Sequence, residues 1–240
     1  MRLSCGKGSH VYNSPSYYNE IDPYAAQWLR NLIAAGHIAA GDVDERSIVD
    51  VRADDLAGYT QAHFFAGIGG WSYALRLAGW PDDRPVWTGS CPCQVLSSAA
   101  RGRNTAADLW RAWVPLIAAN RPREIFGEQV AHKGDWLDRL CDDMGALDYE
   151  IGASVLASVG VGKDHTRPRI YFVGHTHSDR KPGVRFNDEM ARLQRHRSQP
   201  RVLVQANGIP PRMAVFSAFG NAIDPQVASE FISAFMECQP

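Results

Sequence analysis

The stretch Gln61-Ala62-His63-Phe64-Phe65-Ala66-Gly67-Ile68-Gly69-Gly70 decides the fold. It begins as an apolar run typical of a strand and continues into a glycine-rich turn. A helical pattern then runs from Trp71 to Ala78, and Gly79 ends it. Such a turn lets a ligand approach the backbone and the amino end of the helix. On its own the pattern is weak evidence, because a tight strand-to-helix turn needs glycine for steric reasons alone.

The rest of the chain alternates between strand and helix patterns. Asp22, Pro23 and Gly36 fit the amino cap, the first residue and the end of the first helix. Strands that alternate with helices predict an α/β protein with a doubly wound, mainly parallel sheet covered on both faces. We expect strands at 16–20, 47–51, 61–65, 86–88, 124–127, 151–159 and 170–173, and helices at 22–35, 71–78, 109–119, 136–144 and 225–235.

Length and charge limit the possible functions. The 240 residues carry a formal net charge of −1, which argues against a generally basic nucleic-acid binder but allows a local basic patch. We expect a core over 1–175, a small polar insert at 176–205 and a C-terminal segment, 206–240, that returns to the core. No apolar run reaches membrane-spanning length and the start lacks a signal-peptide pattern, so we expect a cytoplasmic protein. We also expect it to be a monomer.

The cysteines indicate neither disulfides nor a metal site. Their number, five, is odd and their spacing is irregular, which argues against a disulfide framework. Cys91 with Cys93, and His175 with His177, are separated by single residues, and this spacing does not match the usual zinc sites. We therefore expect no metal.

A second run, Gly89-Ser90-Cys91-Pro92-Cys93-Gln94, places a cysteine on the turn after a strand. This position favours a nucleophile, although most isolated intracellular cysteines are inert buried thiols. Glu128 ends the next strand at the edge where open α/β sheets carry their sites, and a buried carboxylate there is costly without a role. Arg167 and Arg169 alternate, so on an extended segment both would face one carbonyl, carboxylate or phosphate.

A nucleotide-type cofactor needs an acid on the strand beside the glycine turn, to accept hydrogen bonds from the ribose hydroxyls. The interval from Gly70 to Cys93 holds only one helix and one strand, and no acid there fits. Upstream, Glu20 ends the strand at 16–20, although an exposed helix-cap carboxylate is an equally good interpretation of Glu20 alone. Phe65 precedes the turn, where its ring could lie against a purine.

Together these motifs resemble the DNA (cytosine-5) methyltransferase family. The resemblance covers most of residues 60–235, and five motifs in the family's order are far more specific than any one of them. His63, Gln129 and His165 depart from the family's usual acid, Asn and Gln, and Val95-Leu96 from its Pro-Phe, but no reacting group is lost. The motifs are 64–70 for the cofactor loop, Pro92-Cys93-Gln94 for the nucleophile, Glu128-Gln129-Val130 for Glu-Asn-Val, His165-Thr166-Arg167-Pro168-Arg169 for Gln-x-Arg-x-Arg, and Gly220-Asn221-Ala222-Ile223 with Pro225 for the final motif.

One motif stands in an unusual place. Asn19-Glu20-Ile21-Asp22 resembles the family's ribose-binding motif, which normally follows the cofactor loop but here precedes it. Our hypothesis is a circularly permuted order in which 16–52 supplies strands two and three of the usual fold. Asp50, at the end of the expected strand 47–51, is then the candidate for recognising the adenine amino group, with Asp42 as the second candidate. The hypothesis requires Glu20 to lie near Gly67.

The resemblance implies transfer of a methyl group from S-adenosylmethionine to C5 of cytosine in double-stranded DNA, with S-adenosylhomocysteine as product. Cys93 would add to C6, Glu128 would hold the N3 and amino edge, and Arg169, with Arg167, would hold O2. The base must first leave the stacked duplex. For the cofactor the resemblance implies Phe65, Ala66, Gly67, Ile68, Gly69, Gly70, Glu20, Ile21, Asp50, Asn221 and Ala222, and for DNA we expect Gln94, Ser97, Arg101, Arg103, Arg180, Lys181, Arg185, Arg195 and Arg197.

Three alternatives stay open. The substrate could be RNA, since a related branch of the family modifies transfer RNA. The chain could be a degenerate copy that binds DNA without catalysis, although Cys93, Glu128 and Arg169 are all intact. The group added at C5 could also be larger than methyl. The target sequence and a partner nuclease do not follow from these residues.

Overall fold

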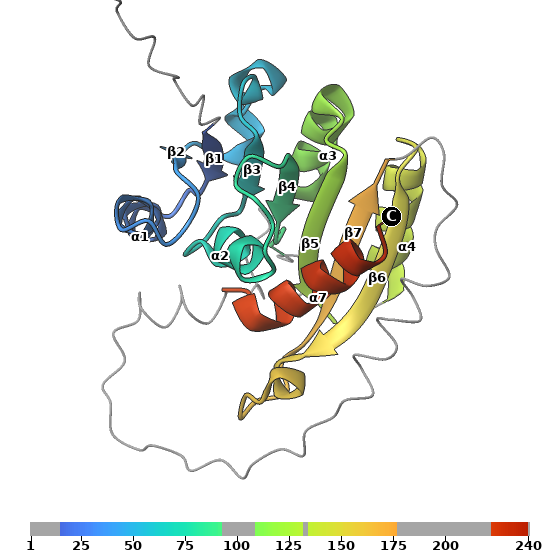
Figure 1. The fold of residues 1–240 in the computed structure, drawn as a ribbon. Coiled ribbons are helices and arrows are strands. Elements are labelled where there is room, and N and C mark those ends of the chain that lie inside the picture. The colour runs from blue at the N-terminus through green and yellow to red at the C-terminus, as the bar shows by residue number, and fades with distance from the viewer. Residues whose placement is uncertain (1–14, 93–108, 132–133, 177–221, 240) are drawn as a thin grey trace, which may run out of the picture.

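The computed structural model describes residues 15–92, 109–131, 134–176 and 222–239. Seven strands form one sheet in the order β2-β1-β3-β4-β5-β7-β6 (Figure 1). Neighbouring strands from β2 to β5 are parallel, whereas β7 is antiparallel to both β5 and β6, so the expected α/β fold with a mainly parallel sheet is confirmed. The strands are β1 Ser16–Asn19, β2 Gly41–Asp44, β3 Gln61–Phe64, β4 Val86–Gly89, β5 Glu124–Val130, β6 Glu150–Ala157 and β7 Pro168–His175.

Helices cover both faces of the sheet because successive strand residues point to opposite sides. Ile125 packs with α3 and α4, for example, whereas Phe126 packs with α2 and α7. Figure 1 shows α1, α2 and α7 on one face and α3 and α4 on the other. The helices are α1 Pro23–Ala34, α2 Gly70–Leu77, α3 Leu109–Asn120, α4 Gly134–Gly145 and α7 Pro225–Glu237, and single 3-10 turns occupy Ile48–Asp50, Ala53–Leu56 and Ser158–Val161.

The first helix, α1, is capped at its amino end by Asp22 and followed at its carboxyl end by Gly36, as the sequence predicted. The Asp22 carboxylate accepts hydrogen bonds from the backbone N–H groups of Tyr24 and Ala25 at 2.9 and 3.0 Å, so it caps the amino end. Gly36, with φ +72°, adopts the left-handed conformation just beyond the carboxyl end. These local contacts fix where the chain leaves β1 and where it turns back toward β2.

The strand expected at 47–51 is wrong. Ile48–Asp50 forms a 3-10 turn, and Ile48 is buried in the core beside α3. The strand that pairs with β1 is Gly41–Asp44 instead. A Cβ at Gly41 would lie 1.9 Å from the Ser16 carbonyl oxygen, so glycine lets the two backbones approach there. The β-branched residues Ile48 and Val49 therefore sit outside the sheet, and Asp50 does not end a strand.

The last helix returns beside the glycine turn. A Cβ at Gly70, the first residue of α2, would lie 2.8 Å from the Ile223 side chain, so this contact depends on glycine. Val227 and Phe231 of α7 are buried together with Trp71 and Leu75 of α2. Among the residues that the structure describes, no helix has the length and apolar character needed to cross a membrane.

Candidate active site

The glycine turn after β3 is held in a conformation that few residues adopt. Phe65, Gly67 and Gly69 have φ values of 52°, 54° and 83°. Glycine reaches this left-handed region freely, but Phe65 carries a side chain, and such strain persists mainly at functional sites. The backbone N–H of Ala66 donates to the Asn19 carbonyl at 3.0 Å, which ties the turn to the end of β1.

Glu20 lies directly against this turn. Its Oε2 accepts a hydrogen bond from the Gly67 N–H at 2.6 Å, and its Oε1 accepts from the Asp22 N–H at 2.9 Å. The contact arises because β1 and β3 are parallel neighbours, so their carboxyl ends meet at one edge of the sheet. The spatial condition that the permuted order requires is therefore met, although 47 positions separate the two residues.

The two acids considered for adenine recognition have different positions. Asp50 is exposed on the 3-10 turn, away from any strand end. Asp42 lies on β2, where its carboxylate accepts a hydrogen bond from the Tyr59 hydroxyl at 2.8 Å. Asp44 ends β2, but it already binds the Arg46 guanidinium and the Tyr17 hydroxyl. Of the two candidates, Asp42 is the one that the sheet carries.

The second half of the site centres on Glu128, a buried residue of β5 with 7% of its surface exposed. Its Oε1 lies 2.8 Å from the Arg169 Nε on β7, the antiparallel neighbour of β5. Burial raises the pKa of the Glu128 carboxyl above its usual value, and the Arg169 and Arg167 guanidinium groups together with a hydrogen bond from Ser90 oppose that rise. The carboxyl group is therefore able to hold a proton more readily than an exposed glutamate.

Arg167 and Arg169 do not lie on one extended segment, because only Arg169 belongs to β7, but the guanidinium groups of both act on Glu128. Arg167 precedes β7 with φ 31°, which turns it out of the extended conformation. Its guanidinium donates to the Ala222 carbonyl at 2.7 Å, whereas Arg169 pairs with Glu128. One arginine thus fastens the final motif to the site, and the other accompanies the buried carboxylate.

Cys93 lies outside the described residues, but the segment that leads to it is fixed. Parallel pairing sets Gly89 of β4 opposite Gly127 of β5. The Gln129 side-chain amide donates to the Cys91 carbonyl at 3.1 Å, a buried contact. The chain just before Cys93 is therefore attached beside Glu128. Also outside the described residues are Gln94, Ser97, Arg101, Arg103, Arg180, Lys181, Arg185, Arg195, Arg197 and Asn221.

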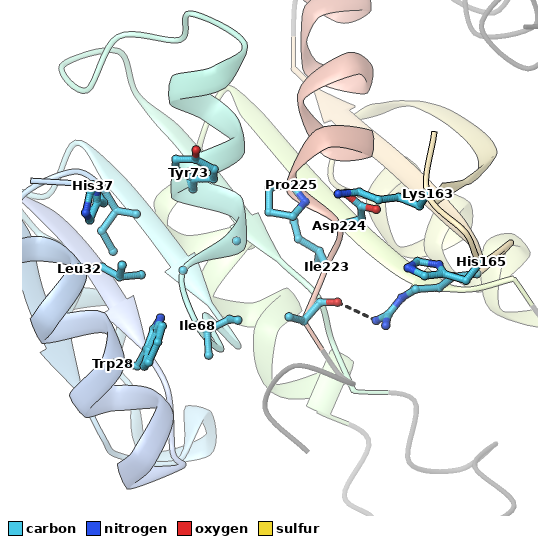
Figure 2. Close-up of a pocket in the computed structure, with 15 residues that line it drawn as sticks. Trp28, Leu32, His37, Ile68, Tyr73, Lys163, His165, Ile223, Asp224 and Pro225 are labelled. Carbon is cyan, nitrogen blue, oxygen red and sulfur yellow. Dashed lines mark hydrogen bonds between the residues drawn. The ribbon is translucent and has the colours of Figure 1, made fainter. Parts of the chain in front are cut away.

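A pocket of about 580 Å³ opens beside the glycine turn, between α1 and the segment before β7 (Figure 2). Trp28 and Leu32 of α1 form one wall, and Lys163 and His165 stand on the opposite side. Glu20, Phe65 and Gly67 do not line it. The full lining is Trp28, Leu32, His37, Ile38, Ile68, Gly69, Gly70, Tyr73, Lys163, His165, Arg167, Ala222, Ile223, Asp224 and Pro225.

The sequence between the glycine turn and the C-terminal segment matches one family. The model of the C-5 cytosine-specific DNA methylases matches residues 79–207, which is more than half of the chain. The chain belongs to the C-5 cytosine-specific DNA methylase family. The matched region includes Cys93, Glu128 and Arg169, and it begins after the glycine turn and Glu20. Among curated proteins, none matches the chain significantly.

Solved structures similar to this methylase-family chain include a mutant DNMT2 from Spodoptera frugiperda, with 12% identity, a TM-score of 0.48, and coverage of 70% of this chain and 44% of that chain. A putative DNA modification methyltransferase encoded within an E. coli prophage has 15% identity, a TM-score of 0.44, and coverage of 67% and 40%. The S. pombe Dnmt2 methyltransferase has 11% identity, a TM-score of 0.44, and coverage of 90% and 69%. The chain spans less than half the length of the first two proteins.

Membership of the methylase family implies S-adenosylmethionine as the methyl donor. The residues at the glycine turn fit this molecule, since a carboxylate, Glu20, stands beside the backbone of the turn that leads into α2. Ile21 is 63% exposed next to that carboxylate and offers an apolar surface to a purine. Among the described residues, no three His, Cys, Asp or Glu side chains are grouped so that they could hold a metal ion.

Sequence reasoning missed two residues of the site. Ser90 lies in the run that was singled out for Cys93, and it contacts Glu128. Trp71 directly follows the glycine turn, and its indole N–H donates to the Ser90 hydroxyl at 3.0 Å. A polar residue directly after a strand was a usable signal for Ser90, whereas the indole contact depends on how α2 packs on the sheet.

Proposed function

We propose that this protein transfers a methyl group from S-adenosylmethionine to C5 of cytosine in double-stranded DNA. The observation that carries the proposal is the pair of the buried Glu128 with the partly buried Arg169, which lies beside the anchored segment that leads into Cys93. A carboxyl group next to a guanidinium can read the polar edge of a pyrimidine, and a cysteine beside them can attack its ring.

Each residue has a distinct role in this reaction. The Cys93 thiolate adds to C6 and pushes electrons toward C5, which is otherwise a poor nucleophile. Glu128, whose pKa burial raises, donates a proton to N3 and accepts from the exocyclic amino group as charge develops in the ring. Arg169 holds the O2 carbonyl. S-adenosylmethionine supplies the methyl group. Loss of the C5 proton then allows Cys93 to leave.

For the cofactor we propose the permuted arrangement. The N-terminal strand β1 lies between β2 and β3, and Glu20, which follows β1, reaches the glycine turn. In this arrangement Glu20 binds the ribose hydroxyls, Phe65 and Ile21 flank the adenine, and Asp42 replaces Asp50 as the adenine acid. Binding of the ribose would exchange the Gly67–Glu20 hydrogen bond for hydrogen bonds to the hydroxyls.

For the substrate we propose duplex DNA, with the target cytosine turned out of the stack. The arginine-rich segments 97–107 and 176–205 would contact phosphates and bases, so binding should weaken as salt rises. We propose that a monomer performs the reaction.

The test is methyl transfer from labelled S-adenosylmethionine to duplex DNA and, in parallel, to RNA, followed by mass spectrometry of the nucleosides. We expect 5-methylcytosine in DNA. Cys93→Ser should abolish transfer while S-adenosylhomocysteine still binds. Methylation of RNA but not of DNA would show that RNA is the substrate. A nucleoside heavier than 5-methylcytosine would show that a group larger than methyl is transferred. Full turnover by Cys93→Ser would overturn the covalent mechanism.

A further inference from the structure

Three side chains form a line from the glycine turn to the buried carboxylate. Trp71, in the first turn of α2, is 3% exposed and packs against Phe126 of β5 with ring centroids 6.3 Å apart. Its indole Nε1 lies 3.0 Å from the Ser90 Oγ. The Ser90 hydroxyl in turn faces the Glu128 carboxyl group and favours its ionised form. The pairing of Gly89 with Gly127 explains this placement, since Ser90 directly follows β4 and Glu128 is the next residue of β5.

The chemistry of the groups gives this line a direction. An indole N–H can only donate, so Ser90 accepts from Trp71 and keeps its single hydroxyl hydrogen for another partner. The ionised Glu128 carboxylate can only accept, and it receives that hydrogen. The Arg169 Nε occupies Oε1 of the same carboxylate at 2.8 Å. Two donors, one just after β4 and one on β7, therefore hold the carboxyl group in one orientation.

We propose that Trp71 and Ser90 are positioning residues that orient Glu128 toward the target base. Trp71 fixes the serine hydroxyl as a donor, and the serine fixes the carboxyl group. The inference rests on the proposed function, because Glu128 is taken to bind the cytosine edge. It goes beyond that function by assigning roles to two residues, and it connects the helix that follows the glycine turn to the half of the site that holds the base.

The burial of Trp71 raises the question of whether its role is only to fill the core. Trp80 offers a matched comparison, since it is buried against the same Phe126 with ring centroids 5.6 Å apart. Its indole N–H donates to the Arg84 carbonyl at 3.1 Å, which has no link to Glu128. A Trp→Phe change at either position removes an indole N–H and some core volume, but only the change at Trp71 touches the proposed line.

The experiment is a double-mutant cycle on the single-turnover rate of methyl transfer across pH. We expect Ser90→Ala to lower the rate roughly tenfold, the effect of losing one hydrogen bond to a carboxylate. The pH at which the rate falls on the basic side should move upward, since the hydroxyl no longer favours the ionised form. Trp71→Phe should act in the same direction but less strongly, and it should add nothing to Ser90→Ala. Ser90→Thr should restore both the rate and the profile.

Trp80→Phe should leave the pH profile in place and combine additively with Ser90→Ala. Additive effects of Trp71→Phe and Ser90→Ala, or an unshifted profile in Ser90→Ala, would overturn the inference. A readout without turnover separates this from the proposed function: the titration of Glu128 followed by carbon-13 NMR. If no nucleic acid is methylated but Ser90→Ala still raises the pH midpoint of the Glu128 titration, the proposed function is wrong, whereas the positioning role of Ser90 is supported. If this midpoint is unchanged in Ser90→Ala, Ser90 does not position Glu128, whether or not the protein methylates nucleic acid.

Discussion

The two halves of the candidate site are assembled by different means. The cofactor half joins Glu20 to the glycine turn through a carboxylate-to-backbone hydrogen bond between neighbouring parallel strands. The base half joins the buried Glu128 to the partly buried Arg169 through an ion pair, with Gln129 holding the segment before Cys93. The family match covers the second half and starts after the first. A site at a sheet edge therefore requires its residues to be adjacent in space, whatever their order along the chain.

Neutralising Glu128 tests whether the base half works separately from the cofactor half. Glu128→Gln keeps the shape but cannot hold a proton for N3, so methyl transfer should fall roughly 10²- to 10³-fold, as for other lost charge-stabilising groups. Binding of S-adenosylhomocysteine, measured by calorimetry, should not change. Glu124→Gln, at the other end of the same buried strand, is the matched control and should retain transfer. Loss of cofactor binding in Glu128→Gln would mean that the two halves are not separable.

The pairing that brings the N-terminal strands to the cofactor half depends on Gly41. Gly41→Ala would place a Cβ 1.9 Å from the Ser16 carbonyl oxygen, so the β1–β2 pair must separate. We expect a loss of about 3 kcal/mol in the free energy of unfolding, measured with denaturant. Gly145→Ala meets no atom within 4 Å and should change stability little. Equal stability of the two variants would show that close approach at Gly41 is not required.

Changing the cofactor carboxylate should have the opposite signature to Glu128→Gln. Glu20→Gln removes the charge that accepts from the ribose hydroxyls, so the KM for S-adenosylmethionine should rise about tenfold while kcat stays near normal. Glu45→Gln removes a half-exposed carboxylate paired with Arg30 and should leave both constants unchanged. A fall in kcat without a change in KM would place Glu20 outside the cofactor site.

The smallest expected effect concerns His63, which lies on β3 below the glycine turn. Complete burial lowers the pKa of His63 to about 3, and the ring is held neutral beside the Thr88 hydroxyl at 2.8 Å. Because the unfolded chain binds this proton near pH 6.5, stability is full above that pH and falls as the pH drops toward 3. At pH 5.5 the loss should be at most about 1.4 kcal/mol. In denaturant titrations, His63→Gln should lose less unfolding free energy than the parent protein between pH 7.5 and 5.5. An identical pH dependence in the two proteins would contradict this role of His63.

The sequence predicted most strands and helices because their local signals agree with the packing. Asp22 caps α1 as expected, and the glycine turn follows β3 as expected. The strand at 47–51 failed because β-branched residues suggest pairing, whereas the packing buries Ile48 beside α3 and pairs Gly41–Asp44 with β1. The expectation that Arg167 and Arg169 lie on one extended segment failed for a similar reason. It assumed extended backbone, and the turn before β7 sends Arg167 to Ala222.

The chemical groups of the site could be recognised from local patterns: a cysteine after a strand, a glutamate on the next strand, and a glycine turn that leads into a helix. These follow from local patterns, because turns and caps depend on residues close together in the chain. Which of these groups meet depends on the three-dimensional fold. The contacts of Glu20 with Gly67, of Arg169 with Glu128, and of Trp71 with Ser90 all cross between elements. They depend on strand order and register, which no local pattern specifies.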